Sequence, residues 1–502
     1  MSAEAAAAPG LPSGAVGRVG RHTVVYAVGI LLGKAVAFLM LPLYTRYMTT
    51  ADYGVIQLID MTLEIVAIVA GSRLGAGVFH LYHKEADAAR RRTILSSAFV
   101  VLASAFLVAG AVSWFGAPLI AHYVLGNESW TRLVRIASVS LAFQSLILIP
   151  LAELQLAEQS LVFVGANMAK LVVQVTLNIV LLVQFRWAAQ GVVASAMVAN
   201  IVIGVPLALR FVRRIGLRVS SSAVRDILRL GLPFIGVQLA KFVQTFGDRY
   251  FLRVAAGTAE VGVYGLGYQF GFLLAQVGFA PFITAWEPLR FEIGRRPDRD
   301  AVFNRVFLVL NVVLFTAGAV IVLFVTDFLR IAVTAPFLPA ARVVPVIVVA
   351  YVFQSWTGFH NYGLFAAERT GLITLANWIG AGVALAGYML LIPRWLGMGA
   401  AWATLLSLGV SEVVVYLAAQ RVHPVAYAWG PTLRLSAIAL AVCGVALALP
   451  QLPLPASIGI HIGLLAVYLA AVWFGGVLSP EDRGRVRGIR PSPQALIAVF
   501  TR

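Results

Sequence analysis

The chain consists of long apolar runs separated by short polar connections. Each run has the roughly 20 residues that a helix needs to cross a bilayer. The pattern predicts an all-α polytopic membrane protein with about 14 transmembrane helices. The predicted spans are residues 22–47, 54–79, 93–114, 133–155, 161–184, 188–209, 228–254, 260–288, 303–328, 340–366, 371–392, 396–420, 432–450 and 456–478.

Two six-residue segments resemble each other and indicate an internal repeat. Residues 50–55 read TADYGV and residues 258–263 read TAEVGV, and a span containing a lysine, Lys34 or Lys241, comes before each. Because a repeat of six spans is even, both copies enter the membrane in the same direction. We therefore predict two parallel six-helix lobes plus two extra C-terminal helices. In transporters of this kind, the substrate site is expected between the lobes near mid-membrane.

This organisation divides the whole chain into lobes, linkers and tails. The first 21 residues are rich in Ala, Gly and Pro and lack the apolar core of a signal peptide. The predicted parts are a flexible cytoplasmic tail (1–21), an N-lobe of spans 1–6 (22–209), a basic cytoplasmic linker (210–227), a C-lobe of spans 7–12 (228–420), spans 13 and 14 (432–478) and a basic cytoplasmic tail (479–502).

Composition and charge support this reading. The sequence is 60% hydrophobic and 12% charged, whereas soluble proteins are about 25% charged, so a water-soluble enzyme is excluded. Of the 38 lysines and arginines, 25 lie in loops or at span ends on the side of the N-terminus and 8 on the other side. The positive-inside rule then makes both termini cytoplasmic. The net charge of +17 is explained mainly by topology and requires no nucleic-acid partner.

Five basic residues lie well inside predicted spans, away from the span ends. A charge at a helix centre costs about 2.5–3.5 kcal/mol on insertion scales, so each should face a wet cavity or a partner. Basic groups outnumber carboxylates at this depth, and we therefore predict an anionic substrate, such as a pyrophosphate, that accepts charge-assisted hydrogen bonds. The predicted pyrophosphate-binding residues are Lys34, Arg73, Lys170, Lys241 and Arg249.

Polar and aromatic residues of the same and neighbouring spans are candidates for contact with a sugar. An aromatic belt at the membrane interface is the alternative for the tyrosines. The predicted sugar and cavity residues are Gln174, Gln244, Tyr264, Tyr268, Gln269, Gln354 and Asn361.

Intramembrane carboxylates point to a second possibility, which is coupling to an ion. Asp60, Glu64 and Asp248 are the candidates, and they leave open a cation-coupled exporter. Asp248 next to Arg249 also fits a structural ion pair. We expect Glu412 to pack or pair at a helix interface.

The sequence lacks the motifs of the common enzyme classes. It contains no nucleotide-binding lysine loop, no HExxH motif and a single cysteine, Cys443. We predict no catalytic residue, no metal site and no cofactor, and therefore not an enzyme. A membrane-embedded polysaccharide polymerase is a less favoured alternative.

Three groups of short motifs carry a resemblance to a known family. They are LPLYTRY at 41–47 followed by ADYG at 51–54, GSRLG at 71–75, and LGLP at 230–233 with GDRYFL at 247–252 and VGVY at 261–264. They resemble the polysaccharide transporter family, the flippases of bacterial O-antigen and exopolysaccharide synthesis. This family shares a superfamily with lipid II flippases and multidrug and toxic compound extruders.

The resemblance implies a carrier in the inner membrane of a bacterium. It would move undecaprenyl-pyrophosphate-linked oligosaccharide of lipopolysaccharide or exopolysaccharide synthesis to the outer leaflet by alternating access. The implied partners are this lipid-linked oligosaccharide, the bilayer, a polysaccharide polymerase and a chain-length regulator. Basic residues of the first, second and eighth helices line the cavity of related lipid II flippases. Lys34 and Arg73 match the first two, but span 8 has Gln269 and Gln276. A lipid II flippase and a cation-coupled multidrug exporter stay open as alternatives.

Overall fold

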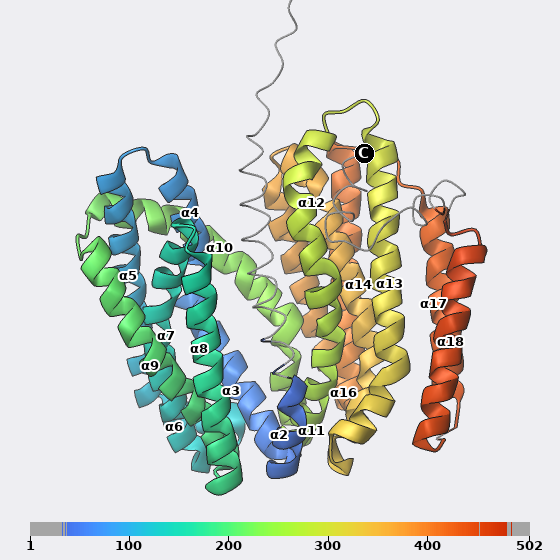
Figure 1. Cartoon of the computed structure of the whole chain (residues 1–502), viewed down its shortest axis with the longest axis horizontal. Helices are drawn as coiled ribbons and strands as arrows, with labels where there is room; N and C mark the ends of the chain where they lie inside the picture. Colours follow the sequence, from blue (N-terminus) through green and yellow to red (C-terminus); the bar gives the residue numbers. More distant parts are fainter. Residues whose placement is uncertain (1–32, 34–35, 37, 451, 479–482, 484–502) are drawn as a thin grey trace, which may run out of the picture. The chain divides into compact units, whose positions relative to one another are not determined.

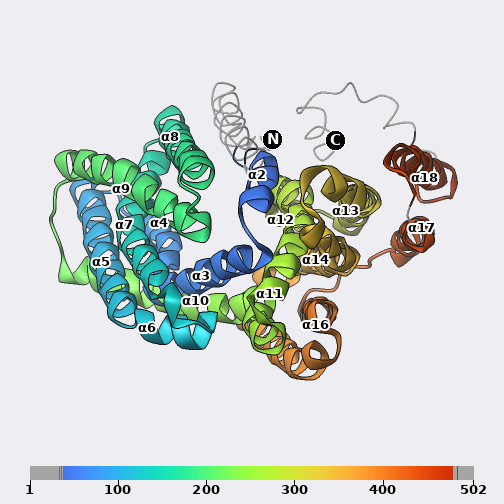
Figure 2. The same ribbon diagram turned by 90° about the horizontal axis from the view of Figure 1, so that it is seen from below.

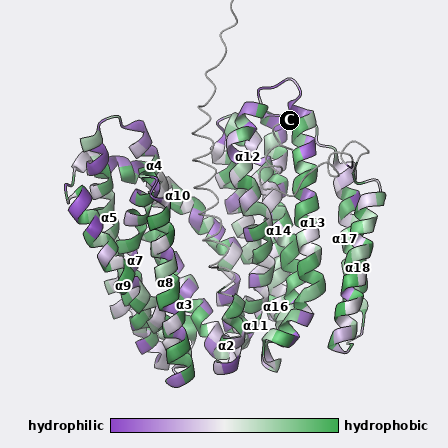
Figure 3. Ribbon diagram, viewed as in Figure 1, coloured by the Kyte–Doolittle hydropathy of each residue, from purple (hydrophilic) through white to green (hydrophobic). Residues whose placement is uncertain are grey.

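Helices joined by short connections make up all regular secondary structure among the described residues (Figure 1). The structure is a computed structural model that describes residues 33, 36, 38–450, 452–478 and 483. Hydrophobic residues dominate the length of the helices, and hydrophilic residues are frequent toward the helix ends (Figure 3). This distribution is the one that a bilayer imposes on a multi-pass protein. The predicted all-α polytopic class is confirmed.

Ten helical runs in the described part of the chain are long and apolar enough to cross a membrane. They cover predicted spans 3 to 14, because two of the runs contain two spans each. The run Ser221–Ile293 is interrupted at Gly257, whose φ is 80°, and α16 (Thr370–Val422) is interrupted at Leu396, whose φ is 48°. Most of predicted span 1 lies outside the described residues. Predicted span 2 is covered by α3 (Thr50–Val69) and α4 (Gly75–Lys84).

The described residues form two compact units. The N-terminal unit contains the described part of Met1–Met48 together with Ile59–Gly236. The C-terminal unit contains Thr49–Leu58 and the described part of Val237–Arg502. The helices α3 and α10 therefore each belong partly to both units. The two units divide within α10 at Gly236, whereas the predicted C-lobe begins at residue 228.

Helices α5, α7 and α9 build the core of the N-terminal unit. The rings of Phe99 and Phe211 lie 5.0 Å apart, and a Cβ added to Gly110 would lie 3.0 Å from the carbonyl oxygen of Ser138. Small residues permit this close approach between apolar helices. The helices of this unit, besides α3 and α4, are α2 (Leu41–Tyr47), α5 (Ala88–Phe115), α6 (Ala117–Ile120), α7 (Thr131–Leu156), α8 (Ser160–Ile179), α9 (Ala188–Ile215) and the first part of α10 (Ser221–Phe246).

The C-terminal unit contains a bundle with two further helices, α17 and α18, at one edge beside α13 (Figures 1 and 2). Its helices, besides the remainder of α10 and α16, are α11 (Asp248–Leu274), α12 (Ala280–Ile293), α13 (Arg299–Ala332), α14 (Val344–His360), α15 (Tyr362–Ala366), α17 (Trp429–Ala448) and α18 (Leu454–Phe474).

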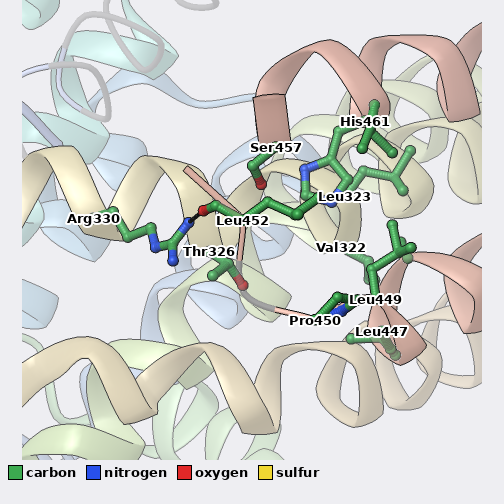
Figure 4. Close-up of a pocket in the computed structure, with 12 residues that line it drawn as sticks. Val322, Leu323, Thr326, Arg330, Leu447, Leu449, Pro450, Leu452, Ser457 and His461 are labelled. Carbon is green, nitrogen blue, oxygen red and sulfur yellow. Dashed lines mark hydrogen bonds between the residues drawn. The ribbon is translucent and has the colours of Figure 1, made fainter. Parts of the chain in front are cut away.

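A buried polar cluster joins α18 to α13. The carboxylate of Asp327 accepts a hydrogen bond from Ser457 at 2.6 Å and pairs with Nδ1 of His461 at 2.6 Å. Beside this cluster lies a cavity of about 150 Å³, where Arg330 donates a hydrogen bond to the carbonyl oxygen of Leu452 at 2.9 Å (Figure 4). Both oxygens of the buried carboxylate are satisfied, as a stable helix interface requires.

The two copies of the repeated segment contact each other within the C-terminal unit. A Cβ added to Gly54 would lie 1.8 Å from the carbonyl oxygen of Thr258, and one added to Gly262 would lie 2.0 Å from that of Thr50. Equivalent positions of the repeat thus exchange equivalent contacts, which is the pattern of two segments related by a two-fold axis. Only glycine fits here, since the backbones themselves are in contact.

Candidate functional site

Helix α8 carries a polar stripe, because the spacing of four polar residues places them on one side of the helix. They are Asn167, Lys170, Gln174 and Asn178. Asn178 is buried and donates a hydrogen bond to the hydroxyl of Tyr44 at 2.8 Å, whereas Asn167 bonds the carbonyl of Phe163 in its own helix. Lys170 and Gln174 are half-buried. Within the described part of the chain, Lys170 has no hydrogen-bond or ion-pair partner. One end of the stripe is therefore bonded to α2 through Asn178, whereas Lys170 in its middle has no such bond in the described part of the chain.

The opposite side of α8 is apolar. Leu161, Val172 and Ile179 are 68%, 62% and 43% exposed, and helical geometry places them on the other side from Lys170 and Gln174. The helix lies at the edge of the N-terminal unit beside α9 (Figure 2). A lipid-facing side and a polar side therefore coexist on one transmembrane helix.

The two acidic candidates of α3 differ in their exposure. Asp60 is exposed and Glu64 is half-buried. Gln57, three residues before Asp60 on the same helix, is buried and packs against Gly265 of α11. Arg73 lies in the short 3-10 helix Ser72–Leu74, and its side chain is outside the described part of the structure. Lys34 also lies outside the described residues.

Lys241 and Gln244 follow one another on α10 but have different environments. The side chain of Lys241 is exposed. Gln244 is buried, donates a hydrogen bond to the carbonyl of Asn377 at 2.7 Å and accepts one from Ser411 at 3.1 Å. Gln244 thus ties α10 to α16, and its amide is fully engaged inside the C-terminal unit.

Asp248 and Arg249 form an ion pair in the interior of the C-terminal unit. Nη1 of Arg249 donates to Asp248 at 2.7 Å and to the carbonyl of Thr245 at 2.9 Å. The guanidinium carbon lies 4.2 Å from the ring centre of Tyr268, and the hydroxyl of Tyr264 donates to Asp248. Arg249 is 1% exposed and Asp248 is fully buried. In this conformation the arginine neutralises its neighbour and presents no exposed donor.

The remaining sugar and cavity candidates divide between interior and surface. Tyr264 and Tyr268 are buried around the Asp248–Arg249 pair. Gln269 is exposed and donates to the hydroxyl of Tyr53 at 3.1 Å. Gln354 is half-buried, and Asn361, also half-buried, accepts a hydrogen bond from Arg290 at 3.0 Å.

Comparison with known families identifies the chain. A family model described as polysaccharide biosynthesis protein matches residues 19–293, more than half of the sequence. The chain belongs to the polysaccharide biosynthesis protein family. This result confirms the family resemblance that the motifs indicated. Among curated proteins, none matches the chain in sequence.

Solved structures show which fold this polysaccharide biosynthesis protein has. The lipid II flippase MurJ in an inward closed conformation superposes with a TM-score of 0.74 at 11% identity, covering 91% of this chain and 100% of MurJ. An inward-facing multidrug resistance MATE family transporter gives 0.62 at 14% identity, covering 80% and 97%. A MOP superfamily transporter from Pyrococcus furiosus, described as having a binding pocket of reversed polarity, gives 0.54 at 13% identity, covering 80% and 95%. The family member therefore has the MurJ and MATE fold.

The sequence did not reveal the partners of several buried polar residues in this family member. Glu412 pairs with His360 from another helix at 2.5 Å. Glu153 pairs with Arg210 at 3.2 Å and with Arg214 at 3.3 Å. A single acid in an apolar run is a usable signal that a partner exists. The sequence does not show which distant residue supplies it.

Proposed function

We propose that this protein is a flippase for undecaprenyl-pyrophosphate-linked oligosaccharide. It would move an O-antigen or exopolysaccharide repeat unit from the inner to the outer leaflet of a bacterial inner membrane by alternating access. Membership of a polysaccharide biosynthesis family and the fold of a lipid II flippase support this proposal. The same proposal implies that the substrate leaves chemically unchanged, so that the protein is a transporter rather than an enzyme.

The observation that carries the proposal is the two-sided character of α8. Placing a half-buried lysine that has no partner among the described residues against lipid would cost free energy. The apolar residues on the opposite side of α8 are the ones suited to contact lipid. Lys170 and Gln174 therefore suit a water-filled site. An ammonium group offers three donors and a positive charge, which a diphosphate accepts as short, charge-assisted hydrogen bonds.

Basic residues elsewhere in the chain are further candidates for binding the diphosphate. Lys241 of the C-terminal unit is exposed, and Lys34 and Arg73 match the basic positions of lipid II flippases in type and helix. Arg249 is neutralised by Asp248 here, so a role in binding would require the ion pair to open. Binding must favour one conformation over the other, because equal affinity for both would shift no equilibrium.

Charge reversal at Lys170 tests the proposal in cells. We expect K170E to abolish surface polysaccharide while the protein stays at its normal level in the membrane, and K170R to retain export. The matched control is K84E, which makes the same charge change at the end of α4 in a predicted cytoplasmic loop and should export normally. Normal polysaccharide in the K170E strain would overturn the assignment of Lys170.

A cation-coupled multidrug exporter is the second candidate. The MATE fold and the exposed carboxylate of Asp60 favour it. A D60N, E64Q double variant should lose drug resistance if cation-coupled drug export is the function. The same variant should leave drug resistance unchanged if the protein is a flippase without this activity.

A further inference from the structure

The cavity between α13, α17 and α18 lies apart from the residues proposed to bind substrate. It has a volume of about 150 Å³ and is found where α17 connects to α18. Helix α13 begins at Arg299 on the predicted cytoplasmic side and ends at Ala332. Arg330 in the cavity therefore lies at the predicted outer surface of the membrane. None of the candidate substrate or coupling residues lines this cavity.

One side of α13 gives the cavity a gradient of polarity. Val322, Leu323, Thr326 and Arg330 line it, and their spacing places them on the same side of the helix. They extend over about 12 Å along the helix, at 1.5 Å per residue. The two apolar residues lie deeper in the predicted membrane, and the hydroxyl and the guanidinium lie toward its surface. A lipid of the predicted outer leaflet has the same order, with its phosphate at the surface and its chains below.

Arg330 has hydrogen-bond donors to offer to a ligand. It is half-buried, and its Nη1 donates to the carbonyl oxygen of Leu452 at 2.9 Å. In the described part of the chain, its Nε and Nη2 and the hydroxyl of Thr326 have no hydrogen-bond partner. A guanidinium carries five donors in a planar fork that fits two oxygens of a phosphate. Arg330 can therefore hold the carbonyl of Leu452 and a phosphate at the same time.

The charge of Arg330 is not neutralised within the cavity. No carboxylate is found among the described residues that line it. Asp327 lies one turn away on α13, but its oxygens are engaged by Ser457 and His461. Figure 4 shows Arg330 directed to the backbone of Leu452 and His461 on the far side of the cavity. The arginine therefore attracts an anion.

The edge of the cavity indicates that this anion belongs to a lipid. Leu447 of α17 is 60% exposed, Ile460 of α18 is 39% exposed, and Thr326 is also exposed. Large apolar side chains exposed on membrane-spanning helices contact acyl chains, so the cavity is open to the bilayer. A cavity of this volume accepts a group the size of benzene, and a phosphate group is no larger.

We propose that this cavity binds the phosphate headgroup of an anionic phospholipid of the predicted outer leaflet. Arg330 donates to the phosphate oxygens, the hydroxyl of Thr326 donates to the phosphate or to the neighbouring ester, and Val322 and Leu323 contact the first part of an acyl chain. Because the cavity is lined by α13, α17 and α18, the bound lipid joins the last two helices to the rest of the unit. The proposal does not depend on the flippase function.

Binding of phosphatidylglycerol to the purified full-length protein tests this site. Lipid is titrated into the protein in detergent, and binding is followed by native mass spectrometry and by the rise in melting temperature. R330Q keeps an amide that can donate to Leu452 but removes the charge and the fork. It should weaken phosphatidylglycerol binding by about 10- to 100-fold at this site, the range expected for charged hydrogen bonds, and lose most of the rise in melting temperature.

Two further variants separate this site from general lipid adsorption. Arg394 is the matched control, because it is exposed at the predicted outer surface and also donates to a backbone carbonyl, that of Leu390, at 2.7 Å. Arg394 does not line the cavity, so R394Q should bind lipid like the wild type. T326F fills the cavity but leaves Arg330 in place, and it should weaken binding as well. This variant keeps the test decisive if R330Q does not fold.

Two partial ligands distinguish a lipid from other occupants. Diacylglycerol has the chains without the phosphate, and glycerol phosphate has the phosphate without the chains. We expect neither to bind as tightly as phosphatidylglycerol. If glycerol phosphate matches it, the site is one for free phosphate, and if diacylglycerol matches it, the cavity is purely apolar; either result would overturn the proposal.

A purely structural role of Arg330 gives a different pattern. R330Q would then melt at a lower temperature without lipid but would keep the full rise on addition of phosphatidylglycerol. That pattern, or equal affinity of the wild type and R330Q for phosphatidylglycerol, would contradict the proposed site.

Discussion

The contact between Gly54 and Gly262 gives a prediction whose size follows from the structure. A Cβ on Gly262 would lie 2.0 Å from the carbonyl oxygen of Thr50 and 2.9 Å from the amide nitrogen of Gly54. Ordinary contact distances between non-bonded heavy atoms are about 3.5–4.0 Å. In G262A, α3 and α11 must therefore move apart by more than an ångström, since both obstacles are backbone atoms that cannot rotate away.

The expected cost combines two opposing effects. Overpacking of a tight contact costs about 1–3 kcal/mol, and alanine gains about 0.8–1.0 kcal/mol over glycine in a helix. G382A in α16 is the matched control, because nothing lies within 4 Å of a Cβ added there and the helix gain is the same. The difference between the two variants should thus isolate the overpacking cost.

Thermal unfolding of the purified full-length protein in detergent measures this difference. We expect the melting temperature of G262A to fall by a few degrees below that of G382A, at about 2–4 °C per kcal/mol or less for a chain of this size. G382A should unfold at or above the wild-type temperature. Equal melting temperatures for the two variants would refute the reasoning that the repeat copies are in backbone contact.

Two further predictions concern charged groups. R249M leaves the buried carboxylate of Asp248 without its partner and should destabilise the protein by about 3–5 kcal/mol. Adding D248N to R249M should recover most of the loss of melting temperature. Equal losses in the single and double variants would contradict the ion pair. Burial and the positive charge of Arg299 lower the pKa of His423. The folded state therefore binds a proton at His423 less readily than the unfolded state does. The resulting stabilisation of the folded state is present above about pH 6.5 and is lost as the pH falls through the lower pKa of the folded state. The melting temperature should therefore fall less in H423Q than in the wild type between about pH 7.5 and pH 5.5, and an equally steep fall in both would argue against this account.

The fold could be predicted from the sequence because the bilayer imposes simple rules. Apolar length determines the spans, and the ten described runs cover spans 3 to 14 as predicted. The repeated TADYGV and TAEVGV segments, matched by letters alone, are in direct contact. The interruption at Gly257 falls between predicted spans 7 and 8, and the interruption at Leu396 falls at the first residue of predicted span 12.

The environments of the candidate site residues could be predicted only in part. Helical spacing correctly placed Lys170 and Gln174 on one side of α8. Helical spacing also places Lys241 and Gln244 on one side of α10, although Lys241 is exposed and Gln244 is buried against α16. Spacing gives the direction of a side chain on its own helix, but its burial depends on which other helix packs there. The roles of the candidate residues in binding stay predictions.

Direct measurement of lipid movement tests the central claim. The protein is reconstituted in liposomes with undecaprenyl-pyrophosphate-linked oligosaccharide labelled on the sugar, and a membrane-impermeant enzyme that cleaves the diphosphate is added outside. In vesicles without protein, only the outer leaflet is accessible, so about half of the lipid should be cleaved. The account predicts that cleavage approaches completion with the wild type and returns to about half with K170E. Cleavage that stops at about half with the wild type as well would contradict it.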